Sequence, residues 1–150
     1  MEATHQTGAL VRLRAGPEAF GMVLDLLSRT APFRYYDLDQ VAAAIRMQLQ
    51  QQCHVAALQD GQLIGYMGWM LTSEAIARLW ATDAGPLKPV PQAEADAVCV
   101  TILASPNSRV LRKLVGLGRT QYATVPVFFK RQSGDRTRKV AVTSMNFASV

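Results

Sequence analysis

Residues 97–108 read Ala-Val-Cys-Val-Thr-Ile-Leu-Ala-Ser-Pro-Asn-Ser, and this stretch decides the fold class. The unbroken apolar run Ala97–Ala104 predicts a strand that is buried on both faces. Pro106 and its polar neighbours open a basic amphipathic helix over 108–117, and a further strand is expected over 123–131. A strand, a helix and a strand in this order predict a crossover unit with parallel strands and a right-handed connection.

Before this unit, the chain predicts a hairpin and a short helix. Strands over 53–58 and 63–71 flank Asp60-Gly61, a dipeptide typical of a two-residue turn. Thr72 or Ser73 then caps a short helix that runs to about Trp80. The next segment, 82–93, holds three prolines and is predicted to lack regular structure.

Two longer helices are expected nearer the N-terminus. Pro17 suits the first turn of a helix over 17–29, which carries apolar residues at helical spacing. A loop rich in aromatic residues follows over 30–36. Asp37 then caps the second helix, and Gln40 three residues later completes a pattern like a capping box.

The element order predicts an α/β (α+β) domain with a mixed sheet of about five strands and helices on both faces. A last strand is expected over 136–145, after a turn at 133–135. The domain organisation follows from this order: 1–16 is an N-terminal arm and 17–150 is one domain.

The composition restricts the function classes. Hydrophobic residues make up 49% of the chain, yet no apolar run reaches the length of a membrane span, and no signal peptide is visible, so a cytoplasmic protein is expected. The few cysteines and histidines exclude a zinc-finger site, and we predict no metal site and two reduced cysteines. These residues are Cys53, Cys99, His5 and His54.

The net charge of +5 is concentrated in the C-terminal third. Between Arg109 and Lys139 the chain has nine Lys or Arg residues and one acidic residue. This imbalance predicts a basic surface that faces an anionic partner, with an ordinary solvated face as the alternative. Aromatic residues do not alternate with the basic residues and no motif for nucleic acid is present, so nucleic acid is not the expected partner.

Several short motifs together resemble the RTX toxin-activating lysine acyltransferases, of which this chain looks like a divergent member. Residues 20–34 resemble the family's first helix and the loop after it, and Ala43–Arg46 resembles a helix end. Gly65–Trp69 and Leu71–Glu74 resemble a strand and the helix start that follows it. Ile102–Pro106 resembles the family's central strand and turn.

This resemblance implies a GNAT-like fold and an enzyme that is an N-acyltransferase. The donor would be a fatty acyl thioester on acyl carrier protein, or acyl-CoA, with no resident cofactor. The acceptor would be a lysine of a protein or ribosomal peptide. A homodimer is a further expectation, since GNAT-like enzymes commonly pair.

The family's catalytic histidine corresponds to Phe33 here, although the next residue, Arg34, is kept. Its aspartate corresponds to Val100 or Thr101. Acyl transfer to an amine needs a base, because a lysine amine is protonated at neutral pH. The main candidate bases are His54, which is otherwise a strand-end histidine with a local hydrogen bond, and Asp37, which is otherwise a helix cap. Asp39, close to Asp37 after the same loop, is a further candidate.

Three further sets of groups are candidates for a role in acyl transfer. Cys99 is a candidate nucleophile or a buried structural thiol, and the tyrosines at 35, 36 and 122 are candidate proton donors or core residues. Backbone N–H groups around Thr101–Ser105 would stabilise the oxyanion. The predicted substrate-binding residues are Phe33, Arg34, Trp69, Thr101, Ser105 and Asn107, with Phe33 and Trp69 lining an acyl tunnel or else belonging to the core.

The turn before the basic helix has no glycine-rich loop of the kind that holds the pyrophosphate of coenzyme A. The basic residues of this helix would instead contact an acidic carrier protein; they are Arg109, Arg112, Lys113 and Arg119. Two alternatives remain open: a catalytically silent module that binds an acyl chain or carrier protein, and a conventional coenzyme-A-dependent acetyltransferase.

Overall fold

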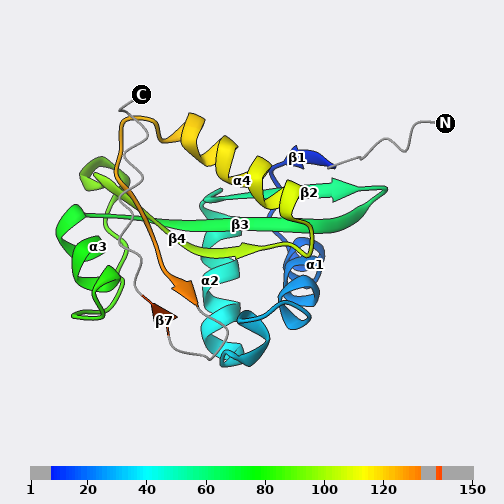
Figure 1. The fold of residues 1–150 in the computed structure, drawn as a ribbon, viewed down its shortest axis with the longest axis horizontal. Helices are drawn as coiled ribbons and strands as arrows, with labels where there is room; N and C mark the ends of the chain where they lie inside the picture. Colours follow the sequence, from blue (N-terminus) through cyan, green and yellow to red (C-terminus); the bar gives the residue numbers. More distant parts are fainter. Residues whose placement is uncertain (1–7, 133–137, 140–150) are drawn as a thin grey trace. The chain divides into compact units, whose positions relative to one another are not determined.

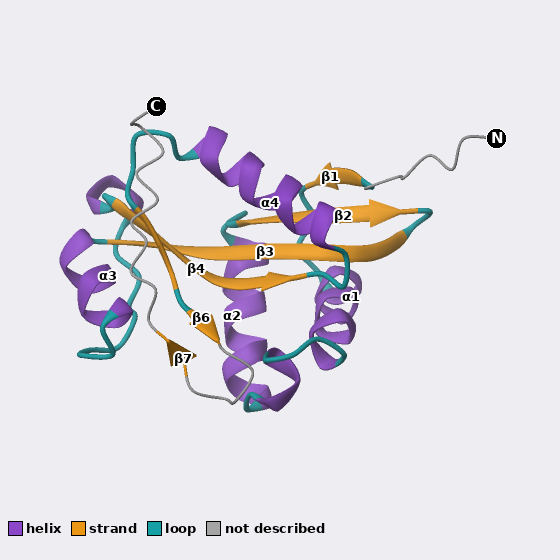
Figure 2. Cartoon of the chain, in the orientation of Figure 1, coloured by secondary structure: helices purple, strands orange, loops and turns teal. Residues whose placement is uncertain are grey.

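The computed structural model describes residues 8–132 and 138–139. Contacts divide the chain into unit 1 (Met1–Met67 and Leu103–Gly116) and unit 2 (Gly68–Ile102 and Leu117–Val150). The helices in the described part are α1 (Pro17–Ser28), α2 (Leu38–Gln50), α3 (Glu74–Ala81) and α4 (Ser108–Gln121), with 3-10 turns η1 (Phe33–Tyr35) and η2 (Gln92–Glu94) (Figure 1). The strands are β1 (Ala9–Val11), β2 (His54–Gln59), β3 (Gln62–Thr72), β4 (Ala97–Ala104), β5 (Val127–Phe129), β6 (Arg131–Gln132) and β7 (Arg138–Lys139) (Figure 2).

The first five strands form one mixed sheet in the order β1-β2-β3-β4-β5. Strand β1 pairs antiparallel with β2, whereas β4 and β5 are parallel. The parallel pair joined by α4 confirms the parallel strands expected of the crossover unit. Within the described residues, no helix is both long and apolar enough to cross a membrane.

The hairpin between β2 and β3 forms where the sequence predicts it. Asp60 has φ 52° and Gly61 has φ 77°, so both central residues of the turn are left-handed. Two left-handed residues are what a type I′ turn requires, and this turn matches the twist of the strands that it joins.

In unit 1, helices cover both faces of β3. A Cβ atom on Gly65 would come within 2.5 Å of Val110 Cγ1, so α4 packs closely on this face at Gly65. The next residue, Tyr66, points to the opposite face, where its hydroxyl donates to Gln48 Oε1 of α2 at 2.9 Å. Together these contacts hold both helices against the same strand.

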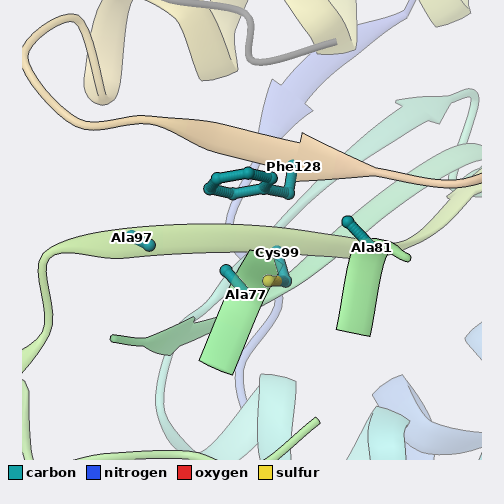
Figure 3. Packing of buried hydrophobic residues seen from close by; sticks show 5 residues of the cluster. All are labelled: Ala77, Ala81, Ala97, Cys99 and Phe128. Carbon is teal, nitrogen blue, oxygen red and sulfur yellow. The ribbon is translucent and has the colours of Figure 1, made fainter. Parts of the chain in front are cut away.

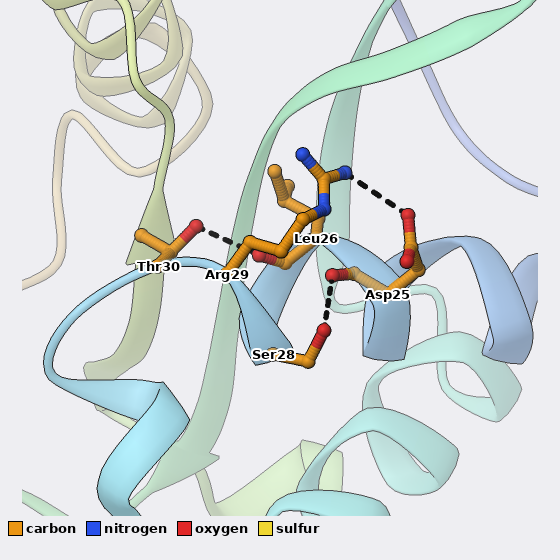
Figure 4. A network of polar contacts seen from close by, with 5 residues as sticks. All are labelled: Asp25, Leu26, Ser28, Arg29 and Thr30. Atoms are coloured by element: carbon orange, nitrogen blue, oxygen red, sulfur yellow. Dashed lines mark hydrogen bonds and ion pairs between the residues drawn. The ribbon is translucent and has the colours of Figure 1, made fainter.

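The C-terminal end of α1 is held by side chains of its last turn and of the two residues that follow (Figure 4). Thr30 Oγ1 donates to the Leu26 carbonyl at 2.7 Å, and Ser28 Oγ donates to the Asp25 carbonyl at 2.7 Å. Arg29 forms an exposed ion pair with Asp25 at 2.9 Å. These bonds occupy carbonyls at the end of the helix, where the backbone leaves several without partners.

In unit 2, α3 packs on β4 and β5 through small residues. Figure 3 shows the alanines of α3 facing the Cys99 thiol and the Phe128 ring. Ser73 caps α3, because its side chain accepts the Ile76 N–H at 3.2 Å. The residues of this cluster, all buried, are Ala77, Ala81, Ala97, Cys99 and Phe128.

Three features differ from the sequence expectations. The residues assigned to an arm contain β1, which pairs with β2 through Ala9–Val11. Helix α4 continues through Gly116 and Gly118 to Gln121, so these glycines do not end it. The strand expected over 123–131 begins only at Val127, because Pro126 has no N–H for the ladder, although its carbonyl accepts the Val98 N–H at 3.0 Å.

The structure describes only part of the last predicted hairpin. Strands β6 and β7 pair antiparallel, Arg131 with Lys139 and Gln132 with Arg138. The predicted turn at 133–135 and the rest of the strand after 139 lie outside the described residues.

Candidate functional site

The turn from β4 into α4 is held to β3 by Ser105. Its hydroxyl donates to the Ile64 carbonyl at 2.6 Å and accepts the Asn107 N–H at 3.1 Å. One side chain therefore bridges the neighbouring strand and the residue just before the helix. These residues all belong to unit 1.

Asn107 is the cap of α4. Its Oδ1 accepts the Arg109 N–H at 2.9 Å, and its carbonyl accepts the Leu111 N–H at 3.1 Å. A helix N-terminus attracts anions through N–H groups that lack intrahelical partners. Here the side chain of Asn107 already occupies the Arg109 N–H, and Ser105 occupies that of Asn107.

Beyond this cap, α4 presents a basic face. Arg109, Arg112 and Lys113 are exposed, and their spacing of three and four residues places them on one side of the helix. The opposite side buries Val110 and Leu114 completely. No acidic residue lies in α4, so every charged side chain that the helix itself carries is positive.

His54 is fully buried at the start of β2. Its Nε2 accepts the Leu13 N–H at 2.8 Å, and its Nδ1 lies 3.2 Å from the Gln48 carbonyl, to which it donates. Burial lowers the pKa of His54, although the hydrogen bond to the Gln48 carbonyl opposes this shift, and the Arg12 guanidinium lowers the pKa further. With both nitrogens engaged inside the protein, the geometry favours the structural alternative over the role of a base.

Asp37 lies at the N-cap of α2, as predicted, but its side chain makes no cap hydrogen bond. The expected capping-box bond from Asp37 is therefore absent, and this carboxylate is exposed. Solvent and a substrate can therefore reach Asp37, and also the exposed Asp39, but not His54.

The aromatic loop before α2 forms the turn η1. Phe33 is half-buried and meets the Tyr36 ring edge-on at 5.7 Å between centroids. The Arg34 guanidinium lies over the Tyr35 ring at 5.1 Å from its centroid. Tyr35 is 55% exposed and Leu38, the first residue of α2, is 68% exposed, so this loop presents apolar surface to solvent.

In unit 2, Trp69 is buried and its Nε1 donates to the Tyr122 hydroxyl at 2.8 Å. The two rings are also in edge-to-face contact at 5.5 Å. This environment is that of a core tryptophan, the alternative to a tunnel lining. Thr101 is half-buried on β4, and Arg119 is exposed near the end of α4.

The parallel pairing of β4 with β5 is short. It runs from Val98 opposite Val127 to Val100 opposite Phe129. Strand β4 continues past Val100 to Ala104, so its last residues extend beyond this pairing. This end of the strand contains the backbone predicted to stabilise an oxyanion.

The Cys99 thiol does not fit the role of a nucleophile. It is fully buried, and burial raises its pKa to about 12, although Lys130 opposes the shift. Both cysteines are free. Among the described residues, no group of three or more His, Cys, Asp or Glu side chains is placed to hold a metal ion.

The sequence did not single out the buried neighbours of His54. Gln48 and Tyr66 are both fully buried, and burial is the main cause that raises the pKa of Tyr66. A signal was present for Gln48, because it lies between Ile45 and Leu49 on the apolar side of α2. A polar residue at a core position usually marks a buried hydrogen bond.

Comparisons with known proteins identify the fold. The GphF GNAT-like decarboxylase in complex with isobutyryl-CoA has a TM-score of 0.64 at 13% identity over 85% of this chain and 67% of that chain. The loading GNATL domain of CurA from Lyngbya majuscula has a TM-score of 0.61 at 10% identity over 83% of this chain and 64% of that chain. Aminoglycoside 6'-acetyltransferase type Ii has a TM-score of 0.59 at 15% identity over 87% of this chain and 76% of that chain.

This chain thus spans less than two thirds of the CurA domain, 64% of its length. No protein-family model matches the sequence, and no curated protein matches it. Identities this low show the fold and not the activity. The chain has a GNAT-like fold, with a mixed five-stranded sheet whose strand β4 leads into helix α4.

Proposed function

We propose that this protein is an acyltransferase that moves a fatty acyl group from an acyl carrier protein thioester to an amine, the side chain of a lysine in a protein or peptide. The GNAT-like fold supports acyl transfer in general, and one of the similar structures binds isobutyryl-CoA, an acyl thioester. The sequence resemblance to the toxin-activating acyltransferases supports the carrier protein and the lysine.

The cap of α4 is the observation that carries the choice of donor. Coenzyme A has a diphosphate, whereas the phosphopantetheine arm of a carrier protein is attached through a single phosphodiester. The Asn107 Oδ1 bond to the Arg109 N–H, at 2.9 Å, uses one of the donors that a diphosphate needs at a helix N-terminus. The carrier-bound donor, with its single phosphodiester, needs fewer of these N–H groups and therefore fits this cap better.

The basic face of α4 supports the same donor. Arg109, Arg112 and Lys113 are exposed on one side of a helix without acidic residues. Carrier proteins present acidic surfaces, and complementary charge speeds encounter and orients the partners. The phosphopantetheine attachment point would then lie near the start of α4.

The reaction requires a free amine, a stabilised oxyanion and a departing thiolate. In the proposed reaction the amine nitrogen attacks the thioester carbonyl carbon, the C–S bond breaks, and the thiolate takes up a proton. The Asp37 carboxylate, exposed and not used as a cap, accepts the proton that the amine loses. Backbone N–H groups at the end of β4 donate to the oxyanion.

Initial rates test the proposal. The protein is mixed with acyl carrier protein charged with chains of several lengths and a peptide containing one lysine, and the peptide mass is followed. We expect a mass gain equal to one acyl group, which an Asp37→Asn variant reduces without loss of folding. An unmodified peptide with every chain length would contradict acyl transfer to lysine.

Charge reversal separates the donors. The variant Arg109→Glu with Arg112→Glu should raise the KM for acyl carrier protein by about tenfold. It should leave the KM for a free acyl-pantetheine thioester unchanged. Arg14→Glu, at another exposed position of unit 1, is the matched control. An equal effect of the reversal on both donors would contradict a carrier contact at α4.

A silent binding module is the second candidate. The observation that favours it is the burial of His54, which leaves this chain without an accessible histidine in its described part. Carrier binding without any mass gain on the peptide would select this alternative. A third candidate, a conventional coenzyme-A-dependent enzyme, requires transfer from acyl-CoA that is at least as fast as transfer from acyl carrier protein.

A further inference from the structure

Four residues form a buried polar cluster in unit 1, outside the proposed donor site. They come from the segment after β1, the end of α2, and the strands β2 and β3. His54, Gln48 and Tyr66 are fully buried, and Leu13 is 7% exposed. The His54 and Tyr66 rings stack with 5.8 Å between centroids and 14° between planes.

The hydrogen bonds fix the protonation state of His54. A carbonyl only accepts, so Nδ1, at 3.2 Å from the Gln48 oxygen, must carry the proton. A backbone N–H only donates, so Nε2, at 2.8 Å from the Leu13 nitrogen, must be bare. The folded arrangement therefore accepts one form of the ring, the neutral Nδ1–H tautomer.

The same short segment is held on its other side by the turn between α2 and β2. Gln52 Nε2 donates to the Leu13 carbonyl at 3.1 Å, and the Arg12 guanidinium donates to the Gln52 carbonyl. Leu13 thus has its N–H bound by His54 and its carbonyl bound by Gln52. Strand β1 ends two residues earlier, at Val11, so this clamp also holds the edge strand of the sheet.

We infer that His54 is an acid-sensitive latch, which holds Leu13 and the adjoining strand β1 on the sheet while its Nε2 is bare and releases them when Nε2 takes up a proton. After protonation, Nε2–H faces Leu13 N–H, and two donors cannot share this bond. The Leu13 N–H then loses its partner in a buried place, which favours opening of the segment.

Burial disfavours the charged form of the ring more strongly than the hydrogen bond to the Gln48 carbonyl supports it. The titratable and charged groups around the ring are Arg12, Cys53 and Tyr66, and none of them is a carboxylate. Burial lowers the pKa of His54 from its usual value of 6.5, and Arg12 lowers it further. When the segment is open, the pKa of His54 returns to its usual value. Opening is therefore accompanied by the uptake of a proton.

The sign of the pH dependence follows from this difference. Above about pH 6.5 both the closed and the open forms are neutral, and the latch is fully effective. As the pH falls below this value, the open form is protonated first. The opening equilibrium constant therefore rises by up to about tenfold per pH unit until the closed form also protonates.

Amide hydrogen exchange of the full chain between pH 8 and pH 5 tests the latch, after correction for the intrinsic pH dependence of exchange. In the wild type, the protection of residues 9–13 should fall by up to about tenfold per pH unit below about pH 6.5. The amides of Val98 and Cys99 on β4 should show no such loss. Protection of residues 9–13 that does not change with pH would overturn the inference.

Two variants separate the latch from general weakening. In His54→Gln, the protection of residues 9–13 should become independent of pH. In Gln52→Gly, which removes the second clamp at a residue with φ 56°, protection should fall equally at every pH and keep the wild-type dependence. Because His54→Gln can fail to fold, nitrogen NMR of the wild-type ring at pH 7.5 provides a second measurement: the Nδ1–H tautomer is expected, and the Nε2–H tautomer would overturn the latch.

Discussion

The missing side chain at residue 65 determines how closely α4 approaches β3. A Cβ on Gly65 would lie 2.5 Å from Val110 Cγ1 and 3.3 Å from both Leu114 Cδ1 and Ser105 Cβ. Val110 is β-branched and buried, so it has little freedom to move. The neighbouring Ser105 is the residue that ties the start of α4 to the Ile64 carbonyl.

Gly65→Ala should therefore lower the free energy of unfolding by about 1–3 kcal/mol, the usual range for an overpacked core. Urea denaturation measures this change. Gly21→Ala is the matched control, because it has nothing within 4 Å and lies inside α1. The control should raise stability by about 0.5–1 kcal/mol, since alanine favours a helix over glycine. Equal effects of the two variants would contradict the close packing at residue 65.

Cys99 gives a second prediction for a single residue. With its pKa raised to about 12, only about one thiol in ten thousand is ionised at pH 8. Iodoacetamide should therefore leave Cys99 unmodified in the folded protein and label it after unfolding in guanidinium. Rapid labelling of Cys99 in the folded state would contradict its place among Ala77, Ala81 and Phe128.

At the scale of elements, α4 is the part of the fold whose length the sequence underestimates. Gly116 has nothing within 4 Å of an added Cβ and lies inside the helix. Gly116→Ala should therefore raise the free energy of unfolding by about 0.5–1 kcal/mol. Gly61→Ala, at a turn residue with φ 77°, should have the opposite sign. A loss of stability in Gly116→Ala would mean that α4 ends at this glycine.

The cap of α4 yields another prediction for this element. Asn107→Ala removes the acceptor of the Arg109 N–H and should cost about 1 kcal/mol of stability. Asn107→Asp keeps an acceptor and adds a negative charge at the helix N-terminus, so it should preserve stability. Thermal unfolding at pH 7 compares the two variants, and equal losses would show that the side chain is not the cap.

Elements with a strong local pattern were predictable from the sequence. The apolar run of β4, the amphipathic pattern of α2 and the Asp60-Gly61 turn all lie where expected. Strand β1 was missed because three residues are too few for an alternating pattern, and its partner β2 lies more than 40 positions further along the chain. The prediction that α4 ends at Gly116 was wrong, because packing of α4 can compensate for the low helix propensity of glycine.

The candidate site was predictable only in part. Ser105 and Asn107 lie together at the start of α4, and the exposed basic residues follow them along the helix. The position of His54 in a buried cluster was not predictable, because its partners Leu13, Gln48 and Tyr66 are brought together only by the fold. The geometry therefore leaves Asp37 and Asp39 as the candidate bases that a substrate can reach.

At the scale of the whole molecule, the basic residues are concentrated in one segment of the chain. Nine of the sixteen basic residues lie between Arg109 and Lys139, and this segment begins with the exposed face of α4. A positively charged surface attracts an acidic partner, and the range of this attraction becomes shorter as the salt concentration rises. The proposed transfer from a carrier protein should accordingly slow as the ionic strength rises, whereas transfer from a small uncharged thioester should not.

A competition between two labelled donors tests the proposed function most directly. Equal concentrations of acyl carrier protein with a deuterated acyl chain and acyl-CoA with the ordinary chain are mixed with the protein and a lysine peptide, and the peptide is weighed by mass spectrometry. The proposal predicts a mass gain that carries the deuterium, because the capped, basic start of α4 favours the carrier-bound donor. A gain without deuterium would identify a conventional coenzyme-A-dependent enzyme, and no gain at all would contradict acyl transfer to lysine.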